Sequence, residues 1–182
     1  MSGRKESAVS VKGLSFAYPM PAGPRQVLAE LEFEVRAGES FGLLGPNGSG
    51  KTTAFRLLST FFPAPPGTVR VLGADAATEP DAVRRAIGVV FQNPSLDTRL
   101  TVEENLLCQG QLYGLHGAEL EERIDEGLER FGLQERANEL VASLSGGLAR
   151  RAELAKGLLH RPRVLLLDEP STGLDPGARK DL

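Results

Sequence analysis

The segment that most constrains this chain is a glycine-rich octapeptide, residues 45–52, with the sequence GPNGSGKT. It fits the phosphate-binding pattern G-x-x-x-x-G-K-[ST] at every fixed position. The apolar run before it, residues 40–44, predicts a buried strand, and residues 53–58 after it predict the opening of a helix. This motif requires a strand, a glycine-rich turn and a helix in that order. We therefore interpret the octapeptide, the phosphate loop, as a binding site for phosphates rather than as a turn that only caps a helix.

The residue types of the phosphate loop explain how it would hold an anion. Its glycines let backbone N–H groups approach phosphate oxygens, and the following helix directs its positive dipole end at the same anion. Lys51 is expected to reach the β- and γ-phosphates of a nucleotide, and the Thr52 hydroxyl is expected to bind Mg²⁺. The predicted nucleotide contacts here are Gly45, Pro46, Asn47, Gly48, Ser49, Gly50, Lys51, Thr52 and Thr53.

Composition narrows the class of protein. With 182 residues, 41% hydrophobic and 25% charged, the chain suits one ordinary globular domain. Its net charge of −3 gives no support to a general nucleic-acid-binding surface, so no nucleic-acid partner is expected. No apolar run is long enough to span a membrane. Cys108 is the only cysteine, which excludes an intrachain disulfide and a cysteine metal cluster. We interpret it as a small buried residue on a helix.

Hydrophobic periodicity predicts several strands before the middle of the chain. Residues 8–18 and 28–35 alternate between apolar and polar side chains, as half-buried strands do. Residues 68–72 and 87–91 are also predicted strands, and residues 81–86 a short helix. Together they indicate an antiparallel sheet beside a parallel core.

A helical block follows, and then a further strand. Thr101 and Glu104 form a capping box that opens a helical region extending to about residue 160. Within it, an apolar stripe predicted to face the core consists of Leu120, Ile124, Leu128 and Phe131. The continuous apolar run at residues 164–167 predicts a strand buried on both faces.

Polar residues follow three of the predicted strands. The phosphate loop follows residues 40–44, Gln92 follows residues 87–91, and Asp168 with Glu169 follows residues 164–167. Ligands in parallel sheets bind beyond the carboxyl ends of the strands. We therefore expect the three groups to converge on one site.

These motifs occur in the order found in one family. They are Tyr18, the phosphate loop, Gln92, the tetrapeptide LSGG at residues 144–147, the strand ending in Asp168 and Glu169, and STGLD at residues 171–175. On these residues the chain resembles the ATP-binding subunit of ABC transporters, from about residue 9 to residue 176. Phosphate loops occur in many proteins, but this combination is specific. A GTPase is disfavoured because the sequence contains no Asn-Lys-x-Asp.

The resemblance implies an α/β fold: a P-loop NTPase parallel-sheet core with an N-terminal antiparallel β-subdomain and an inserted helical subdomain. One ABC-type domain would occupy residues 1–182. Residues 1–94 and 162–182 would form the β-subdomain and core, and residues 95–161 the helical subdomain. Family members carry a histidine after a further strand, which this chain does not reach at Leu182. We expect the final core strands to be absent, as in a truncated form. Neither His116 nor His160 occupies that position.

The resemblance also implies roles for individual residues. Tyr18 would stack on adenine, although an aromatic at a strand edge is the simpler reading of that residue alone. Asp168, with Thr52 and Gln92, would bind Mg²⁺. Glu169 would polarise the attacking water, with Gln92 and Lys51 also serving catalysis. Gln92 would link the core to the helical block.

A second molecule would complete the site. Ser145, Gly146 and Gly147 are predicted to open a helix whose N-terminus binds the nucleotide of a second subunit in a head-to-tail dimer, with Asp175 near that interface. Ser145 could equally cap its own helix. Family members carry glutamine where this chain has Leu148. We expect Leu148 to pack inward with Ala152, Ala155 and Leu159.

The implied function is hydrolysis of Mg-ATP to drive transport through a membrane-spanning permease. Residues 93–97, 100–106 and 112–115 are similar to the ABC-2-type exporter branch, which includes drug-resistance exporters. The chain would be cytoplasmic and peripheral on the inner face of the cell membrane. Two alternatives stay open: a hydrolysis-deficient nucleotide-binding fragment, and a non-transport ABC ATPase of DNA repair or translation.

Overall fold

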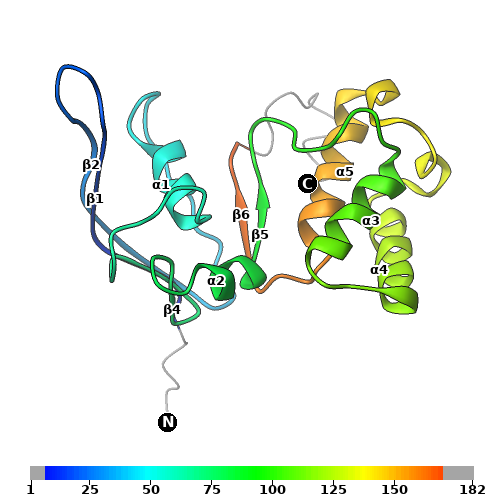
Figure 1. The fold of residues 1–182 in the computed structure, drawn as a ribbon, viewed down its shortest axis with the longest axis horizontal. Coiled ribbons are helices and arrows are strands. Elements are labelled where there is room, and N and C mark those ends of the chain that lie inside the picture. Colours follow the sequence, from blue (N-terminus) through cyan, green and yellow to red (C-terminus); the bar gives the residue numbers. More distant parts are fainter. Residues whose placement is uncertain (1–6, 170–182) are drawn as a thin grey trace, which may run out of the picture. The chain divides into compact units, whose positions relative to one another are not determined.

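The structure of the chain is a computed structural model that describes residues 7–169 (Figure 1). It contains two compact units. The first unit ends at Ile87 and the second begins at Gly88, within a strand. Each unit has its own sheet, and the two are described separately below.

The first unit is built on an antiparallel sheet in the order β2-β1-β3-β4. Strands β1 (Ser7–Tyr18) and β2 (Arg25–Arg36) form the long hairpin drawn in blue in Figure 1. The short strands β3 (Val69–Val71) and β4 (Ala74–Asp75) continue the sheet. In β2 the apolar side chains face the protein and the glutamates face solvent, as the alternation predicted. The predicted antiparallel sheet is therefore confirmed.

Helix α1 (Lys51–Leu58) and helix α2 (Pro80–Ala86) complete the first unit. Five of the eight residues of α1 are buried. Apolar side chains from the sheet and both helices fill the interior: Val9, Val11, Leu14, Leu28, Ala54, Phe55, Leu57, Leu58, Val69, Val71 and Val83. Removing this surface from water stabilises the unit by about 25 cal/mol for each Å² of apolar area.

One strand prediction in this unit was wrong. Residues 40–44, ahead of the phosphate loop, adopt no regular structure, and Leu44 is 97% exposed. An apolar run forms a buried strand only where neighbouring strands bond to it and cover it. Among residues 7–169 no strand pairs with this segment, so its hydrophobicity alone does not define its structure.

The second unit joins a two-stranded sheet to a helical block. Strands β5 (Ile87–Val90) and β6 (Val164–Leu167) lie side by side and run in the same direction (Figure 1). Between them the chain forms α3 (Val102–Leu112), α4 (Gly117–Arg130) and α5 (Gly146–Leu158), with two 3₁₀ turns, η1 (Gln134–Arg136) and η2 (Val141–Ser143). This insertion of helices between parallel strands agrees with the predicted fold class.

The N-terminus of α3 confirms the predicted capping box. The backbone N–H of Thr101 donates to Oε2 of Glu104 at 2.8 Å, and the backbone N–H of Glu104 donates to Oγ1 of Thr101 at 3.1 Å. Both bonds satisfy N–H groups that a helix start otherwise leaves unpaired.

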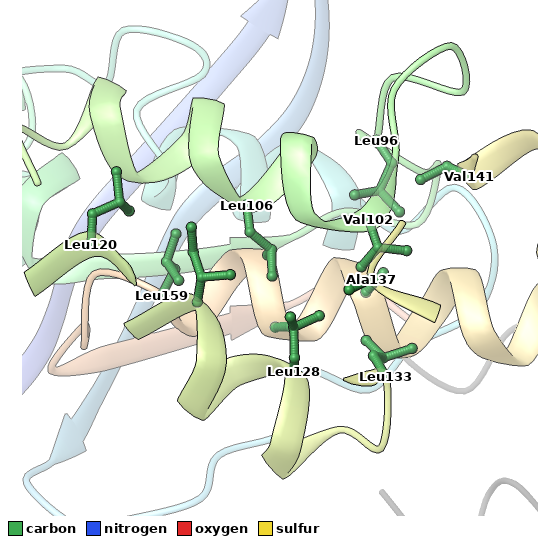
Figure 2. Packing of buried hydrophobic residues seen from close by; sticks show 12 residues of the cluster. Leu96, Val102, Leu106, Leu120, Leu128, Leu133, Ala137, Val141 and Leu159 are labelled. Atoms are coloured by element: carbon green, nitrogen blue, oxygen red, sulfur yellow. The ribbon is translucent and has the colours of Figure 1, made fainter. Parts of the chain in front are cut away.

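Helices α3, α4 and α5 share one hydrophobic core (Figure 2). The predicted stripes are confirmed, because Leu120, Ile124 and Leu128 are buried and Phe131 packs against them. Leu148 packs inward beside the α5 stripe, as expected. The full cluster comprises Leu96, Val102, Leu106, Leu120, Ile124, Leu128, Leu133, Ala137, Val141, Ala152, Ala155 and Leu159.

Two burial predictions in the second unit were wrong. Strand β6 is not buried on both faces, since Leu165 is 39% exposed and Leu167 nearly as much. In the described chain β5 is its one neighbour, so alternate side chains remain open to solvent. Cys108 is exposed rather than buried, because the buried side of α3 is formed by Val102, Asn105, Leu106 and Gly110. Among residues 7–169, no helix combines the length and apolar character that a membrane crossing requires.

Candidate functional site

The backbone of the phosphate loop depends on glycine at its junction with α1. Gly50 caps the helix with a φ of 94°, in the left-handed region that side chains disfavour. A Cβ at this position would lie 2.7 Å from Cδ2 of Leu28 and 3.0 Å from the carbonyl oxygen of Val27. Gly50 therefore serves both the turn and the close approach of the loop to β2.

Lys51 ties the loop to itself. Its Nζ donates to the carbonyl oxygen of Gly45 at 2.7 Å and to that of Pro46 at 3.0 Å. The backbone N–H of Ser49 donates to the same Pro46 oxygen at 3.2 Å. These contacts hold a cationic ammonium group over the loop, which is the position from which a lysine reaches an anion bound by the loop N–H groups.

Tyr18 ends β1 among aromatic side chains of the first unit. Its ring lies edge-on to Phe16, with centroids 5.1 Å apart, and edge-on to Phe62, with centroids 5.9 Å apart. Its hydroxyl lies 3.1 Å from Oγ1 of Thr53 on α1. The ring orientation is thus fixed by packing and by one hydrogen bond. Its stacking on adenine stays a prediction.

A cluster of polar side chains lies where β5 and β6 end. The Nε2 of Gln92 donates to Oε2 of Glu169 at 3.1 Å. Asp168 is buried, and its backbone N–H donates to the carbonyl oxygen of Val90 at 2.9 Å. Glu169 has a φ of 47°, a conformation uncommon outside glycine. Such strained residues concentrate at functional sites.

A buried arginine supports this cluster. Arg150 of α5 donates from Nη1 to the carbonyl oxygen of Phe91 at 2.8 Å. Burial lowers the pKa of its guanidinium, while the charges of Glu153 and Asp168 oppose that shift. A cation is therefore held close to Asp168.

Ser145 caps α5, as one of the two interpretations proposed. Its Oγ accepts a hydrogen bond from the backbone N–H of Leu148 at 3.4 Å. Gly147 lies in the first turn of α5, and a Cβ built there would meet no atom of the described chain within 4 Å. Packing within the described chain therefore does not explain why Gly147 is a glycine.

The structure brings together part of the predicted site. Tyr18, the phosphate loop, Thr52 and Thr53 lie in the first unit, whereas Gln92, Ser145–Gly147, Asp168 and Glu169 lie in the second. Convergence of the phosphate loop with the Gln92–Glu169 pair stays a prediction, as do the predicted subdomain boundaries. Asp175 lies outside the described residues.

Sequence reasoning missed three charged residues on α5. Arg150, Glu153 and Lys156 all contact residues 91–96 with their side chains. Their spacing of three residues places them on one side of the helix, and this pattern could have indicated a charged contact surface on α5. We did not predict that surface, because the apolar stripe of α5 already explained why the helix is buried.

Comparison with known proteins gives a consistent result. The ABC transporter family model matches residues 28–172 of this chain. Nod factor export ATP-binding protein I of Sinorhizobium fredii is 44% identical over 176 residues, which are 97% of this chain and 50% of that protein. Daunorubicin/doxorubicin resistance ATP-binding protein DrrA of Streptomyces peucetius is 41% identical over 182 residues, all of this chain and 54% of that protein. The chain therefore spans about half the length of these relatives.

Solved structures agree with the sequence comparison. An ATP binding subunit of an ABC transporter superposes with a TM-score of 0.82 and 32% identity, over 96% of this chain and 71% of the other. A dimeric ATP-binding cassette in a post-hydrolysis state, bound to ADP and Pi, gives a TM-score of 0.83 and 28% identity, over 95% and 78%. The predicted fold class is confirmed by both.

Proposed function

This chain belongs to the ABC transporter family, and on that premise we propose that it binds Mg-ATP and hydrolyses it to drive export through a membrane-spanning partner. Relatives named for Nod factor export and for daunorubicin and doxorubicin resistance support export as the direction of transport. The chain would then act at the membrane surface through that partner.

The observation that carries the proposal is the contact between Gln92 and Glu169. The Glu169 carboxylate accepts one hydrogen bond from Gln92 through Oε2, at the end of the strand that also carries Asp168. In the proposed reaction, Glu169 orients the water that attacks the γ-phosphate and receives its proton. Gln92 would keep that carboxylate in position.

The phosphates would bind at the loop before α1. Its N–H groups, the N-terminus of α1 and the Lys51 ammonium group all favour an anion at the same place. In the described structure Lys51 contacts loop carbonyl oxygens. We expect it to exchange these for oxygens of the β- and γ-phosphates.

The residues proposed for Mg²⁺ fit a hard cation. Thr52, Gln92 and Asp168 offer hydroxyl, amide and carboxylate oxygens, and Gln92 donates to Glu169 through its nitrogen, which leaves its oxygen for a metal. Among residues 7–169 no three His, Cys, Asp or Glu side chains gather as a metal site. Because Mg²⁺ demands octahedral coordination, phosphate oxygens would serve as further ligands. When bound, the ion would neutralise charge on the phosphates.

A second ATP-binding subunit would supply the other half of each site. The position of residues 145–147 at the start of α5 and the absence of any atom of residues 7–169 within 4 Å of a Cβ built on Gly147 support approach by a ligand from outside this chain. We propose a head-to-tail dimer in which residues 145–147 contact the nucleotide of the partner. The dimeric cassette among the similar structures supports pairing of two such subunits.

Turnover of Mg-ATP by the complete protein with its membrane partner tests the proposal. We expect Glu169→Gln to lower the turnover rate by about 100-fold while ATP still binds, because the amide does not accept the proton of the attacking water. Glu129→Gln on the exposed side of α4 is the matched control and should leave turnover unchanged. Equal turnover by Glu169→Gln and wild type would refute the role of Glu169. Binding without hydrolysis by wild type would favour a non-catalytic nucleotide-binding protein.

A further inference from the structure

The segment that carries Gln92, residues 91–97, has no regular secondary structure. We call it the Gln92 loop. Backbone polar groups in such a segment need partners outside helices and strands. Here side chains of two helices of the second unit provide them.

Glu153 of α5 provides most of these contacts. Its Oε1 accepts hydrogen bonds from the backbone N–H groups of Ser95 and Leu96, the latter at 2.8 Å. Its Oε2 accepts from the Ser95 hydroxyl at 3.0 Å. Glu153 is only 2% exposed. Burying a carboxylate is costly unless it is paired and hydrogen-bonded, so its three donors account for its presence inside the unit.

Two cations of the same helix complete the contact. Lys156 donates from Nζ to the carbonyl oxygen of Ser95 at 2.7 Å and to its Oγ at 3.1 Å. Burial lowers the pKa of Lys156, and the charge of Glu153 opposes that shift. Arg150 donates to the carbonyl oxygen of Phe91, at the start of the loop.

Helix α3 fixes the other end of the Gln92 loop. The Nδ2 of buried Asn105 donates to the carbonyl oxygen of Asp97 at 3.0 Å, and its Oδ1 accepts from the backbone N–H of Asp97 at 2.8 Å. The loop is therefore held before and after Gln92, while the Gln92 side chain itself reaches Glu169.

We propose that Glu153 is a positioning residue for Gln92: it fixes the Gln92 loop to α5 and thereby sets the contact between Gln92 and Glu169. Glu153 lies on the same helix as Ser145, which caps its start. This inference rests on the proposed function, because it concerns the residues assigned to hydrolysis.

Hydrogen exchange tests whether Glu153 holds the loop, in the full chain and without reference to activity. We expect Glu153→Ala to raise the exchange rates of the Ser95 and Leu96 amides by about ten-fold or more, since each loses its acceptor. Glu153→Gln keeps an acceptor oxygen and should restore most of the protection. Glu129→Ala is the control for removing a carboxylate from an exposed site. Unchanged exchange in a folded Glu153→Ala protein would overturn the inference.

Steady-state kinetics of the complete transporter tests whether Glu153 acts through Gln92. We expect Glu153→Ala to lower kcat by about ten-fold, with KM for ATP changed less than about two-fold. In the double variant with Gln92→Ala, adding Glu153→Ala should cost nothing further. Multiplicative losses would show that Glu153 acts independently and would overturn the inference. If Glu153→Ala does not fold, Ser95→Ala, which removes the hydroxyl that donates to Glu153, replaces it in the same cycle with Gln92→Ala.

The two proposals fail in different ways. A wild-type protein that neither binds nor hydrolyses Mg-ATP would refute the proposed function, and the exchange experiment alone would then decide whether Glu153 holds the loop. Normal hydrolysis by wild type, with multiplicative losses of kcat in the double variant, would refute only the role of Glu153.

Discussion

The Tyr18 hydroxyl lies 3.1 Å from Oγ1 of Thr53, joining the end of β1 to the first turn of α1. Thr53 is buried, directly follows Lys51 and Thr52, and is itself one of the predicted nucleotide contacts. The contact therefore links the aromatic residue proposed to stack on adenine with the helix whose N-terminus would face the phosphates.

Two substitutions at Tyr18 separate its ring from its hydroxyl. Tyr18→Phe should lower the free energy of unfolding by about 1 kcal/mol, because it removes one hydrogen bond, and should leave ATP affinity nearly unchanged. Tyr18→Ala should weaken ATP binding by about ten-fold through loss of a stacking surface. Titration with a fluorescent ATP analogue measures both affinities. Full affinity in Tyr18→Ala would show that Tyr18 is only an aromatic residue at a strand edge.

Gly50→Ala should destabilise the first unit. It forces a side chain into the left-handed region and places a Cβ against Leu28 and Val27, so we expect a loss of about 3 kcal/mol in the free energy of unfolding. Gly38→Ala is the matched control, since Gly38 also has a positive φ but its Cβ would meet no atom within 4 Å. It should cost about 1 kcal/mol. Urea denaturation measures the free energy of unfolding of both variants. Equal losses would show that the contact between the added Cβ and Leu28 does not destabilise the protein.

Asp75 should make stability depend on pH. Its carboxylate is buried and accepts hydrogen bonds from the backbone N–H groups of Ala77 and Gly67 at 2.9 and 2.8 Å. The bond from Ala77 is the largest cause that lowers its pKa below the ordinary 3.8; burial opposes the shift, and Gly67 and the charge of Arg70 add to it.

Because folding lowers the pKa of Asp75, its ionised carboxylate stabilises the folded protein at pH values above the pKa of the unfolded state. This stabilisation is lost as the pH falls through the pKa of the folded state. We expect Asp75→Asn to lower the free energy of unfolding by about 2 kcal/mol at neutral pH. The difference from wild type should shrink below about pH 4. Thermal unfolding across this pH range measures it, and a difference that does not vary with pH would contradict this account.

The core of the helical block should be sensitive to single truncations. Leu106 is fully buried between α3, α4 and α5, so Leu106→Ala should cost about 3 kcal/mol in the free energy of unfolding. Leu112 on the same helix is 83% exposed, and Leu112→Ala should change stability by less than about 0.5 kcal/mol. Chemical denaturation followed by circular dichroism distinguishes them. A similar loss in both would contradict this prediction, because it would show that burial does not decide the cost of truncating a leucine on α3.

Features with a local cause were predictable from the sequence. The capping box of Thr101 and Glu104 depends on residues three positions apart, and the stripe of Leu120, Ile124 and Leu128 depends on helical periodicity. The glycines of the phosphate loop belong to a fixed pattern. Each was read from a short window. The structure contains the capping box and the stripe as predicted, and Gly48 and Gly50 have positive φ values, but the strand predicted before the loop is absent from the described residues.

Features with a non-local cause were not predictable. Residues 40–44 and β6 have the hydrophobicity of buried strands, but their exposure depends on which other strands cover them. The spacing of Glu153 along α5 is visible in the sequence, but its partners Ser95 and Leu96 lie more than 50 residues earlier in the chain, so the contact itself was not predictable. The positive φ of Glu169 likewise follows from its surroundings rather than from its residue type.

Equilibrium binding of Mg-ATP to Lys51→Ala tests whether residues 45–52 bind the nucleotide. We predict that this variant loses measurable binding, because the ammonium group over the phosphate loop is removed, while Lys12→Ala on the exposed part of β1 binds as wild type does. Isothermal titration calorimetry provides the affinities. Unaltered ATP affinity in Lys51→Ala would contradict the assignment of residues 45–52 as the nucleotide site.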